Sequence, residues 1–268
     1  MKAICFAMPA LLLSAALLFT QCASRKTAYP GVKSEWEGCE RYDFQVEGRD
    51  AIVVLPAKPA EGRPWIWRPA FFDAFAQVDK ALLKDGWAVA YYDVTHLYGS
   101  PRAVALSKAF YDFVVPAFKL APKVAVEGFS RGGYFSFAWA AAFPETVSCL
   151  YVDAPVCDIT SWPGRASELW KDFLAEWGVA DEDVDSSFEG NALSHLPAIA
   201  AAGIPIVCVC GDSDATVPYE RNMRPFYEAY LAAGGEVELF LKPGCDHHPH
   251  SLEDPKPVVD FIEGHFGL

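Results

Sequence analysis

Ser130 lies between two glycines in the run Gly128-Phe129-Ser130-Arg131-Gly132. A short, β-prone apolar stretch (residues 123–126) comes directly before this run, and an apolar stretch with helical spacing (residues 134–143) follows it. A serine on so sharp a turn has a strained backbone, and small neighbours let the strand and the helix pass closely. The turn would expose the hydroxyl and direct the free N–H groups of the helix N-terminus at negative charge forming beside it. The pattern therefore predicts a nucleophilic serine.

Two aspartates follow a second apolar run. Residues 204–210 predict a buried strand, and Gly211-Asp212-Ser213-Asp214 comes directly after it. An aspartate here could hold a catalytic histidine in the tautomer needed for proton transfer. The other aspartate would cap the helix expected to begin near Pro218, because Asp is a favoured capping residue. The spacing alone leaves both assignments open.

Three histidines follow a third apolar run. Residues 237–241 predict a strand, and the loop after it contains His247, His248 and His250. Imidazole titrates near neutrality, so one of these side chains is suited to take the proton of a serine hydroxyl. Histidine clusters also bind metal ions, but no carboxylate or cysteine set with zinc-ligand spacing accompanies this one. We therefore expect no metal site and no cofactor.

The order serine, aspartate, histidine, with each residue following a probable strand, resembles that of the α/β-hydrolase superfamily. The resemblance extends over about residues 40–268. It implies Asp214 as the catalytic acid, because in that family the acid lies three residues after the loop glycine and precedes a Val-Pro pair. Asp212 remains the alternative.

The same resemblance implies His247 as the catalytic base, since the family's histidine is the first one after a Pro-Gly turn. His248 remains the alternative, and His250 is expected to pack or support the loop. Ser130 would then attack a carbonyl carbon, His247 would accept its proton and Asp214 would stabilise the imidazolium.

An oxyanion hole needs two backbone N–H donors. One is expected from Arg131, the residue after the nucleophile. The other is expected from the loop after the strand at residues 65–68, where Pro69 has no N–H, so Ala70 or Phe71 would donate. The Arg68 side chain could bind a substrate carboxylate or simply pair with an acidic residue.

The remaining pattern predicts a doubly wound, mostly parallel sheet of the α/β-hydrolase type, since strands alternate with helices. An antiparallel pair is expected at residues 42–46 and 51–55 and a further strand at 147–152. Other expected elements are helices at 72–85, 101–120 (bent or broken near Pro116) and 258–266, and a strand at 88–94.

Residues 157–202 interrupt this alternation and predict a small helical cap over the active site. The segment is rich in aromatic side chains, including Trp162, Trp170, Phe173 and Trp177. These could stack on sugar rings, with Trp162 as a substrate-binding candidate, or pack on the domain itself.

The amino-terminal residues predict export. Lys2 precedes an apolar stretch at residues 3–19, which has the proportions of a secretory signal. Cleavage after residue 21 resembles that of bacterial lipoproteins, in which the following cysteine, here Cys22, carries the lipid. We expect a signal peptide at 1–21, a tether at 22–38 (its polar part at 23–35) and a hydrolase domain at 39–268. The protein would be an exported lipoprotein anchored to a bacterial membrane, with an ordinary signal peptide or an uncleaved anchor as the alternatives.

The net charge limits the kinds of partner, and the positions of the cysteines indicate which thiols are buried. The net charge of −13 provides no basic stripe for phosphates, so no nucleic-acid partner is expected. Of the cysteines, Cys149, Cys208 and Cys210 are expected in buried strands. Cys39, Cys157 and Cys245, in or near loops, could be oxidised outside the cytoplasm, with a pairing that the sequence does not give.

Three motifs look like those of secreted bacterial hydrolases: Trp-x-Trp-Arg at residues 65–68, Gly-x-Ser-Arg-Gly-Gly at 128–133 and His-His-Pro-His-Ser-Leu at 247–252. This similarity implies a carboxylic ester hydrolase acting on small esters or glycan esters, such as acyl or methyl esters of polysaccharides.

One alternative is a serine peptidase of the prolyl oligopeptidase type, which shares the Gly-x-Ser-x-Gly-Gly pattern. The expected lack of a large amino-terminal propeller counts against it. A second alternative is a non-catalytic binding lipoprotein on the same fold. The oligomeric state is left open.

Overall fold

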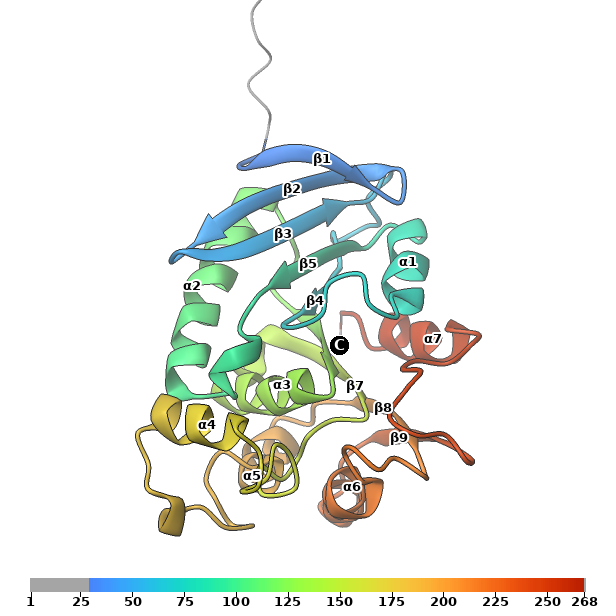
Figure 1. The fold of residues 1–268 in the computed structure, drawn as a ribbon. Coiled ribbons are helices and arrows are strands. Elements are labelled where there is room, and N and C mark those ends of the chain that lie inside the picture. Colours follow the sequence, from blue (N-terminus) through green and yellow to red (C-terminus); the bar gives the residue numbers. More distant parts are fainter. Residues whose placement is uncertain (1–28, 268) are drawn as a thin grey trace, which may run out of the picture.

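A mostly parallel sheet with helices on both faces forms the frame of the protein (Figure 1). The computed structural model describes residues 29–267. Over these residues the sheet has nine strands in the order β1-β2-β3-β5-β4-β6-β7-β8-β9. The strands are β1 (Val32–Trp36), β2 (Cys39–Val46), β3 (Arg49–Leu55), β4 (Trp65–Arg68), β5 (Ala88–Tyr92), β6 (Val124–Phe129), β7 (Val147–Asp153), β8 (Ile206–Gly211) and β9 (Val237–Lys242). Strands β1, β2, β3 and β5 pair antiparallel, and all pairs from β5 to β9 are parallel.

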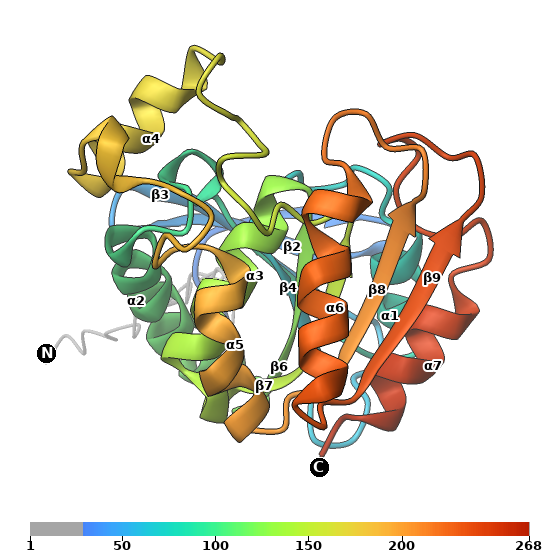
Figure 2. The same ribbon diagram turned by 90° about the horizontal axis from the view of Figure 1, so that it is seen from below.

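Seven α-helices of the described chain flank this sheet or stand beside it. They are α1 (Gln77–Lys84), α2 (Pro101–Phe118), α3 (Arg131–Ala142), α4 (Leu169–Trp177), α5 (Ala192–Ala201), α6 (Met223–Ala232) and α7 (Lys256–Gly264). Helices α2, α3, α5 and α6 cover one face, while α1 and α7 pack together on the other (Figure 2). Each face has its own apolar core, since alternate residues of the buried strands point to opposite sides. This is the predicted α/β-hydrolase fold, and that prediction is confirmed.

The sheet begins earlier than the sequence pattern predicted. Strand β1 pairs with β2 from Val32 opposite Asp43 to Trp36 opposite Cys39, so these residues belong to the sheet rather than to the predicted 22–38 tether. The strand lies at the sheet edge, and only Trp36 is buried. An edge strand exposed on both faces carries polar residues, which is why its sequence resembles that of a linker.

Two predicted helices differ in extent. Helix α1 begins at Gln77 rather than near residue 72, because Phe71, Asp73 and Phe75 all have positive φ angles, which no α-helix allows. Helix α2 continues past Pro116 and ends at Phe118.

The predicted cap at 157–202 divides into two parts. Helix α5, at its end, packs against α3 and α6 as part of the layer that covers the sheet. Helix α4 and its flanking turns stand outside this layer (Figure 2). Trp170 and Phe173 of α4 are buried in a small apolar cluster with Tyr98 and Tyr134. These aromatic side chains therefore pack on the domain, whereas Trp162 is only half-buried.

The remaining expectations concern the membrane anchor at the amino terminus and the state of the cysteines. No helix within residues 29–267 is long and apolar enough to cross a membrane. The expected signal peptide and Cys22 lie outside the described residues. Cys149, Cys208 and Cys210 are buried in strands as predicted, and the six cysteines of the described part of the chain are all free thiols.

Candidate active site

Ser130 occupies the turn between β6 and α3. Its φ of 52° and ψ of −123° are strained values for a residue with a side chain. Backbone hydrogen bonds hold this turn: the Ser130 N–H donates to Asp153 O at 2.9 Å, and the Val156 N–H donates to Ser130 O at 2.9 Å. Asp153 is the last residue of β7 and Val156 lies in the segment after it, so the neighbouring strand and its loop support the strain at the nucleophile.

Two glycines are required by close packing rather than by backbone angles. A Cβ on Gly128 would lie 2.4 Å from Ser136 Oγ and 2.7 Å from Gly133 Cα. A Cβ on Gly133 would lie 2.4 Å from Pro155 Cβ. Either contact would push α3 away from β6 or β7. The glycines therefore let the helix begin directly beneath the nucleophile.

The structure brings Ser130, His247 and Asp214 together in the arrangement of a catalytic triad. His247 Nε2 lies 3.0 Å from Ser130 Oγ, and His247 Nδ1 lies 2.7 Å from Asp214 Oδ2. All three residues are buried, with 6–8% of each residue's surface exposed. Ser130, Asp214 and His247 follow β6, β8 and β9, whose carboxyl ends lie at one edge of the sheet. The residues implied by the family resemblance are thus in hydrogen-bonding contact.

Neighbouring acids hold the two loops in this geometry. Asp214 Oδ1 accepts hydrogen bonds from the N–H groups of Thr216 and Val217, both at 2.8 Å, which fixes the carboxylate. Asp246 accepts from the N–H groups of His247 at 2.7 Å and Ala215 at 2.9 Å, joining the histidine loop to the aspartate loop. These backbone hydrogen bonds lower the pKa of Asp246.

Asp212, the alternative acid, has a different position. It is exposed and accepts a hydrogen bond from the Gly244 N–H at 2.7 Å. It therefore ties the β9 loop to the β8 loop and does not contact a histidine.

The expected oxyanion donors also lie beside Ser130. Arg131 is the first residue of α3, where a backbone N–H has no partner within the helix. Across from it, Gly132 packs on the loop after β4: a Cβ on Gly132 would lie 3.3 Å from Ala70 Cβ. Phe71, next in this loop, has φ of 55°. Arg131 and the loop with Ala70 and Phe71 thus lie beside the nucleophile, and the role of their peptide N–H groups as oxyanion donors stays a prediction.

The guanidinium of Arg68 is paired with acids of the protein and is not free to bind a substrate. Its side chain is 1% exposed and lies 3.3 Å from both Asp79 and Glu127, and it donates to Ala74 O at 2.8 Å. The prediction that it could bind a substrate carboxylate is wrong, because two internal carboxylates occupy the guanidinium. Burial raises the pKa of Glu127 well above its ordinary value, although Arg68 acts against this shift.

A second aspartate–histidine pair lies beside the triad, and sequence analysis missed its acid. His250 Nδ1 lies 2.6 Å from Asp153 Oδ1, and the Ser251 N–H donates to Asp153 Oδ2 at 2.6 Å. The His250 ring stacks on Phe129 at 5.1 Å between ring centroids. Asp153 ends β7, the strand between those that carry Ser130 and Asp214. The expected supporting role of His250 thus depends on its hydrogen bond to Asp153. The signal in the sequence that could have indicated this partner is an aspartate at the end of a predicted strand.

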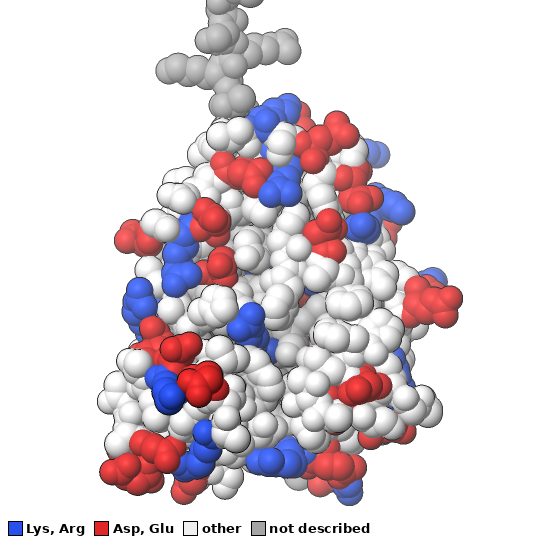
Figure 3. All heavy atoms as spheres, viewed as in Figure 1, with Lys and Arg blue, Asp and Glu red and all other residues white. Residues whose placement is uncertain are grey.

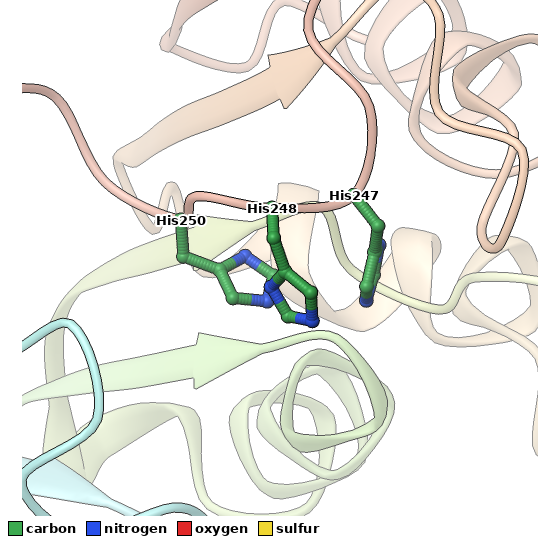
Figure 4. A group of neighbouring side chains, drawn as sticks. All are labelled: His247, His248 and His250. Atoms are coloured by element: carbon green, nitrogen blue, oxygen red, sulfur yellow. The ribbon is translucent and has the colours of Figure 1, made fainter.

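The third histidine, His248, is exposed and stacks on Phe75. Figure 4 shows the three side chains on one loop, with His248 beside His250 and His247 set apart. One nitrogen from each lies within 4.8 Å of the others. Burial lowers the pKa of His248, and the other two histidines add to this effect. His247 and His250 each form a hydrogen bond with an aspartate, so one ring nitrogen of each already has a partner within the protein.

A model of the prolyl oligopeptidase family matches residues 109–268, which contain the whole triad. The chain belongs to the prolyl oligopeptidase family. The protein is therefore a serine hydrolase of that family. Among curated proteins it is similar to the acylamino-acid-releasing enzyme of Mus musculus, with 28% identity over 144 residues. That match covers 50% of this chain and 19% of the mouse enzyme, so the chain spans about a fifth of its relative.

Solved structures agree on the fold. A puromycin-hydrolysing peptidase of Mycobacterium tuberculosis gives a TM-score of 0.64 at 16% identity, covering 85% of this chain and 39% of that one. A bacterial membrane phospholipase A gives a TM-score of 0.55 at 15% identity, covering 87% and 88%. The family and the curated relatives support the peptidase alternative better than the predicted ester hydrolase.

Proposed function

We propose that the protein is a serine peptidase that hydrolyses N-acylated peptides. The observation that carries the proposal is the contact of Ser130, His247 and Asp214 within a chain of the prolyl oligopeptidase family. The similarity to an acylamino-acid-releasing enzyme favours an acylated amino terminus as the group that the site accepts.

In the first half of the reaction, Ser130 Oγ attacks the scissile carbonyl carbon and its proton passes to His247 Nε2, 3.0 Å away. Asp214 stabilises the imidazolium through Nδ1. The negative charge forming on the carbonyl oxygen is stabilised by the N–H groups of Arg131 and of Ala70 or Phe71. When the carbon–nitrogen bond breaks, His247 returns the proton to the departing amine, and the acyl group remains on Ser130 as an ester.

In the second half, water attacks this ester. His247 takes a proton from the water, and the resulting tetrahedral species loses Ser130 Oγ, which regains the proton from His247. The carboxylic acid product is released and the enzyme is restored. The same steps hydrolyse an ester, so the substrate panel must separate amides from esters.

The test uses acetyl-alanine p-nitroanilide, alanine p-nitroanilide, glycyl-proline p-nitroanilide and p-nitrophenyl acetate, together with acetylated xylan and methylated pectin. We expect acetyl-alanine p-nitroanilide to be cleaved with a higher kcat/KM than its unacylated counterpart. Hydrolysis of p-nitrophenyl acetate is also expected, because this activated ester is intrinsically more reactive. Ser130→Ala should lower every activity by about 10⁴-fold or more with an unchanged circular dichroism spectrum.

Two outcomes would reject the proposal. Release of acetate or methanol from the polysaccharides without cleavage of any anilide would favour the glycan esterase. Cleavage of glycyl-proline p-nitroanilide but not of the acylated substrate would instead indicate a dipeptidyl peptidase specificity.

A further inference from the structure

Arg131 differs from every other arginine that the structure describes. Each of the others donates a hydrogen bond or forms an ion pair with a carboxylate, a hydroxyl group or a backbone carbonyl; these are Arg41, Arg49, Arg63, Arg68, Arg102, Arg165, Arg221 and Arg224. Within residues 29–267 the Arg131 guanidinium has no such partner, although the side chain is half-buried. A half-buried cation without an acceptor among the described residues therefore lies directly after the nucleophile.

Two aromatic rings hold this guanidinium in place. Its central carbon lies 5.2 Å from the centroid of Phe71 and 5.9 Å from the centroid of Trp162. Phe71 belongs to the oxyanion loop after β4, and Trp162 belongs to the segment that leads to α4. The guanidinium thus lies where the oxyanion loop and the cap segment meet, beside Ser130. Aromatic contacts of this kind do not use the N–H donors of the guanidinium.

The groups that surround Arg131 do not neutralise it. Burial lowers the pKa of Arg131, while Tyr98 and Asp93 act in the opposite direction. Tyr98 is buried, and its hydroxyl has no hydrogen-bond partner among the described residues. On the face shown in Figure 3, the hollow near the middle is bordered mainly by uncharged groups, with a basic side chain at its edge. In a protein with a net charge of −13, an anionic substrate needs a local cation.

We propose that Arg131 binds a carboxylate of the substrate close to the scissile carbonyl, so that the enzyme prefers acidic acylated peptides. A guanidinium presents a planar pair of donors to a carboxylate, and the contacts with two rings restrict where this guanidinium can lie before substrate binds. The proposal rests on the proposed hydrolytic function of the same site. It assigns to Arg131 the recognition that the sequence suggested for Arg68.

The carboxylate can come from two sources, the C-terminus of a short peptide or an acidic side chain on the acyl side. Two substrate pairs distinguish them. The first pair is acetyl-Ala-Phe with a free carboxylate and the same peptide as its C-terminal amide. The second pair is acetyl-Glu p-nitroanilide and acetyl-Gln p-nitroanilide.

The measured quantity is the ratio of kcat/KM for the acid to kcat/KM for its neutral counterpart. Because the backbone N–H of Arg131 serves the reaction itself, any general effect of a substitution cancels in this ratio. Wild-type enzyme should prefer the acid in at least one pair. Arg131→Met should lower that ratio by about 10- to 100-fold, the usual worth of a hydrogen bond to a charged group.

Arg131→Gln, which keeps a planar amide against the rings but not the charge, provides a second variant should the methionine variant fail to fold. Arg221→Met is the matched control, since Arg221 pairs with Asp158 and should leave the ratio at its wild-type value. Wild-type ratios in the folded Arg131 variants, or a wild-type preference for the neutral member of both pairs, would overturn the proposal.

Failure of the peptidase proposal is separable from failure of this one. If no amide is cleaved, the same ratio is measured with mono-p-nitrophenyl adipate and its methyl ester. A ratio that falls in Arg131→Met would then support the carboxylate site on an esterase, and an unchanged ratio would reject it.

Discussion

His250→Phe should damage catalysis without removing any member of the triad. His247 lies on a loop between β9 and α7 that has no regular secondary structure. The His250–Asp153 hydrogen bond at 2.6 Å ties this loop to the end of β7. Phenylalanine has a similar volume and can keep the stacking on Phe129, so the substitution removes chiefly the hydrogen bond.

The expected magnitude follows from what Asp153 loses. Its Oδ2 keeps the Ser251 N–H at 2.6 Å, while its Oδ1 is left buried without its partner. A hydrogen bond to a charged group contributes about 1.5–3 kcal/mol, so the free energy of unfolding should fall by about that amount. A shift of the catalytic imidazole by about 1 Å can cost about 100-fold in rate, so kcat should fall by about 10- to 100-fold with a smaller change in KM.

Urea denaturation followed by tryptophan fluorescence gives the first quantity, and steady-state hydrolysis of the best substrate gives the second. His250→Asn, which can return an N–H toward Asp153, should recover part of the lost kcat. His265→Phe is the matched control, because His265 lies at the end of α7 and bonds Phe261 and Glu236. The reasoning is refuted if His250→Phe keeps wild-type kcat, or if it loses stability alone while His250→Asn restores nothing.

Three further predictions concern the triad acid, the buried charges and the anchor. Asp214→Asn should lower kcat by about 10⁴-fold, whereas Asp212→Asn, which loses only the loop contact to Gly244, should stay within about tenfold; equal losses in a kinetic assay would contradict the assignment. Glu127 has a raised pKa in the folded state, so the stability that its protonated form contributes is present below its ordinary pKa and is lost as pH rises through the folded value. Glu127→Gln mimics the protonated form and should gain stability relative to wild type between pH 5 and pH 9 in urea titrations; parallel pH profiles would count against this. Cys22→Ala should release the exported protein from bacterial membranes or block its processing, with unchanged kinetics; recovery of the unmutated protein as a soluble, unlipidated species that begins after residue 23 would reject a lipid anchor.

The sequence could predict the residues of the triad because each one follows a strand. A buried parallel strand is a short apolar run, and the residue after it necessarily lies at the carboxyl edge of the sheet. Ser130, Asp214 and His247 all have such a run before them. The position after a strand does not separate Asp214 from Asp212, because both follow β8. Only the backbone path of the loop decides which carboxylate meets the imidazole.

Edge strands and caps could not be predicted in the same way. Strand β1 is exposed on both faces and has no apolar periodicity, so its pairing with β2 leaves no trace in composition. The aromatic residues of α4 indicated burial but not their partner. Trp170 and Phe173 pack against Tyr98 and Tyr134, which are distant in sequence, and a contact of that kind requires the fold.

The exchange of roles between Arg68 and Arg131 shows where sequence reasoning reaches its limit. Both arginines lie at the carboxyl end of a central strand, and both could meet a substrate carboxylate. Arg68 lies within β4, where its side chain meets Asp79 of α1 and Glu127 of the adjacent β6. Arg131 begins α3, beyond the sheet, where two aromatic rings contact its guanidinium and no acid within residues 29–267 forms an ion pair with it. Acidic residues of the protein that surround an arginine form ion pairs with its guanidinium. The arginine that remains available to a substrate carboxylate is therefore the one that the fold leaves without an internal acid.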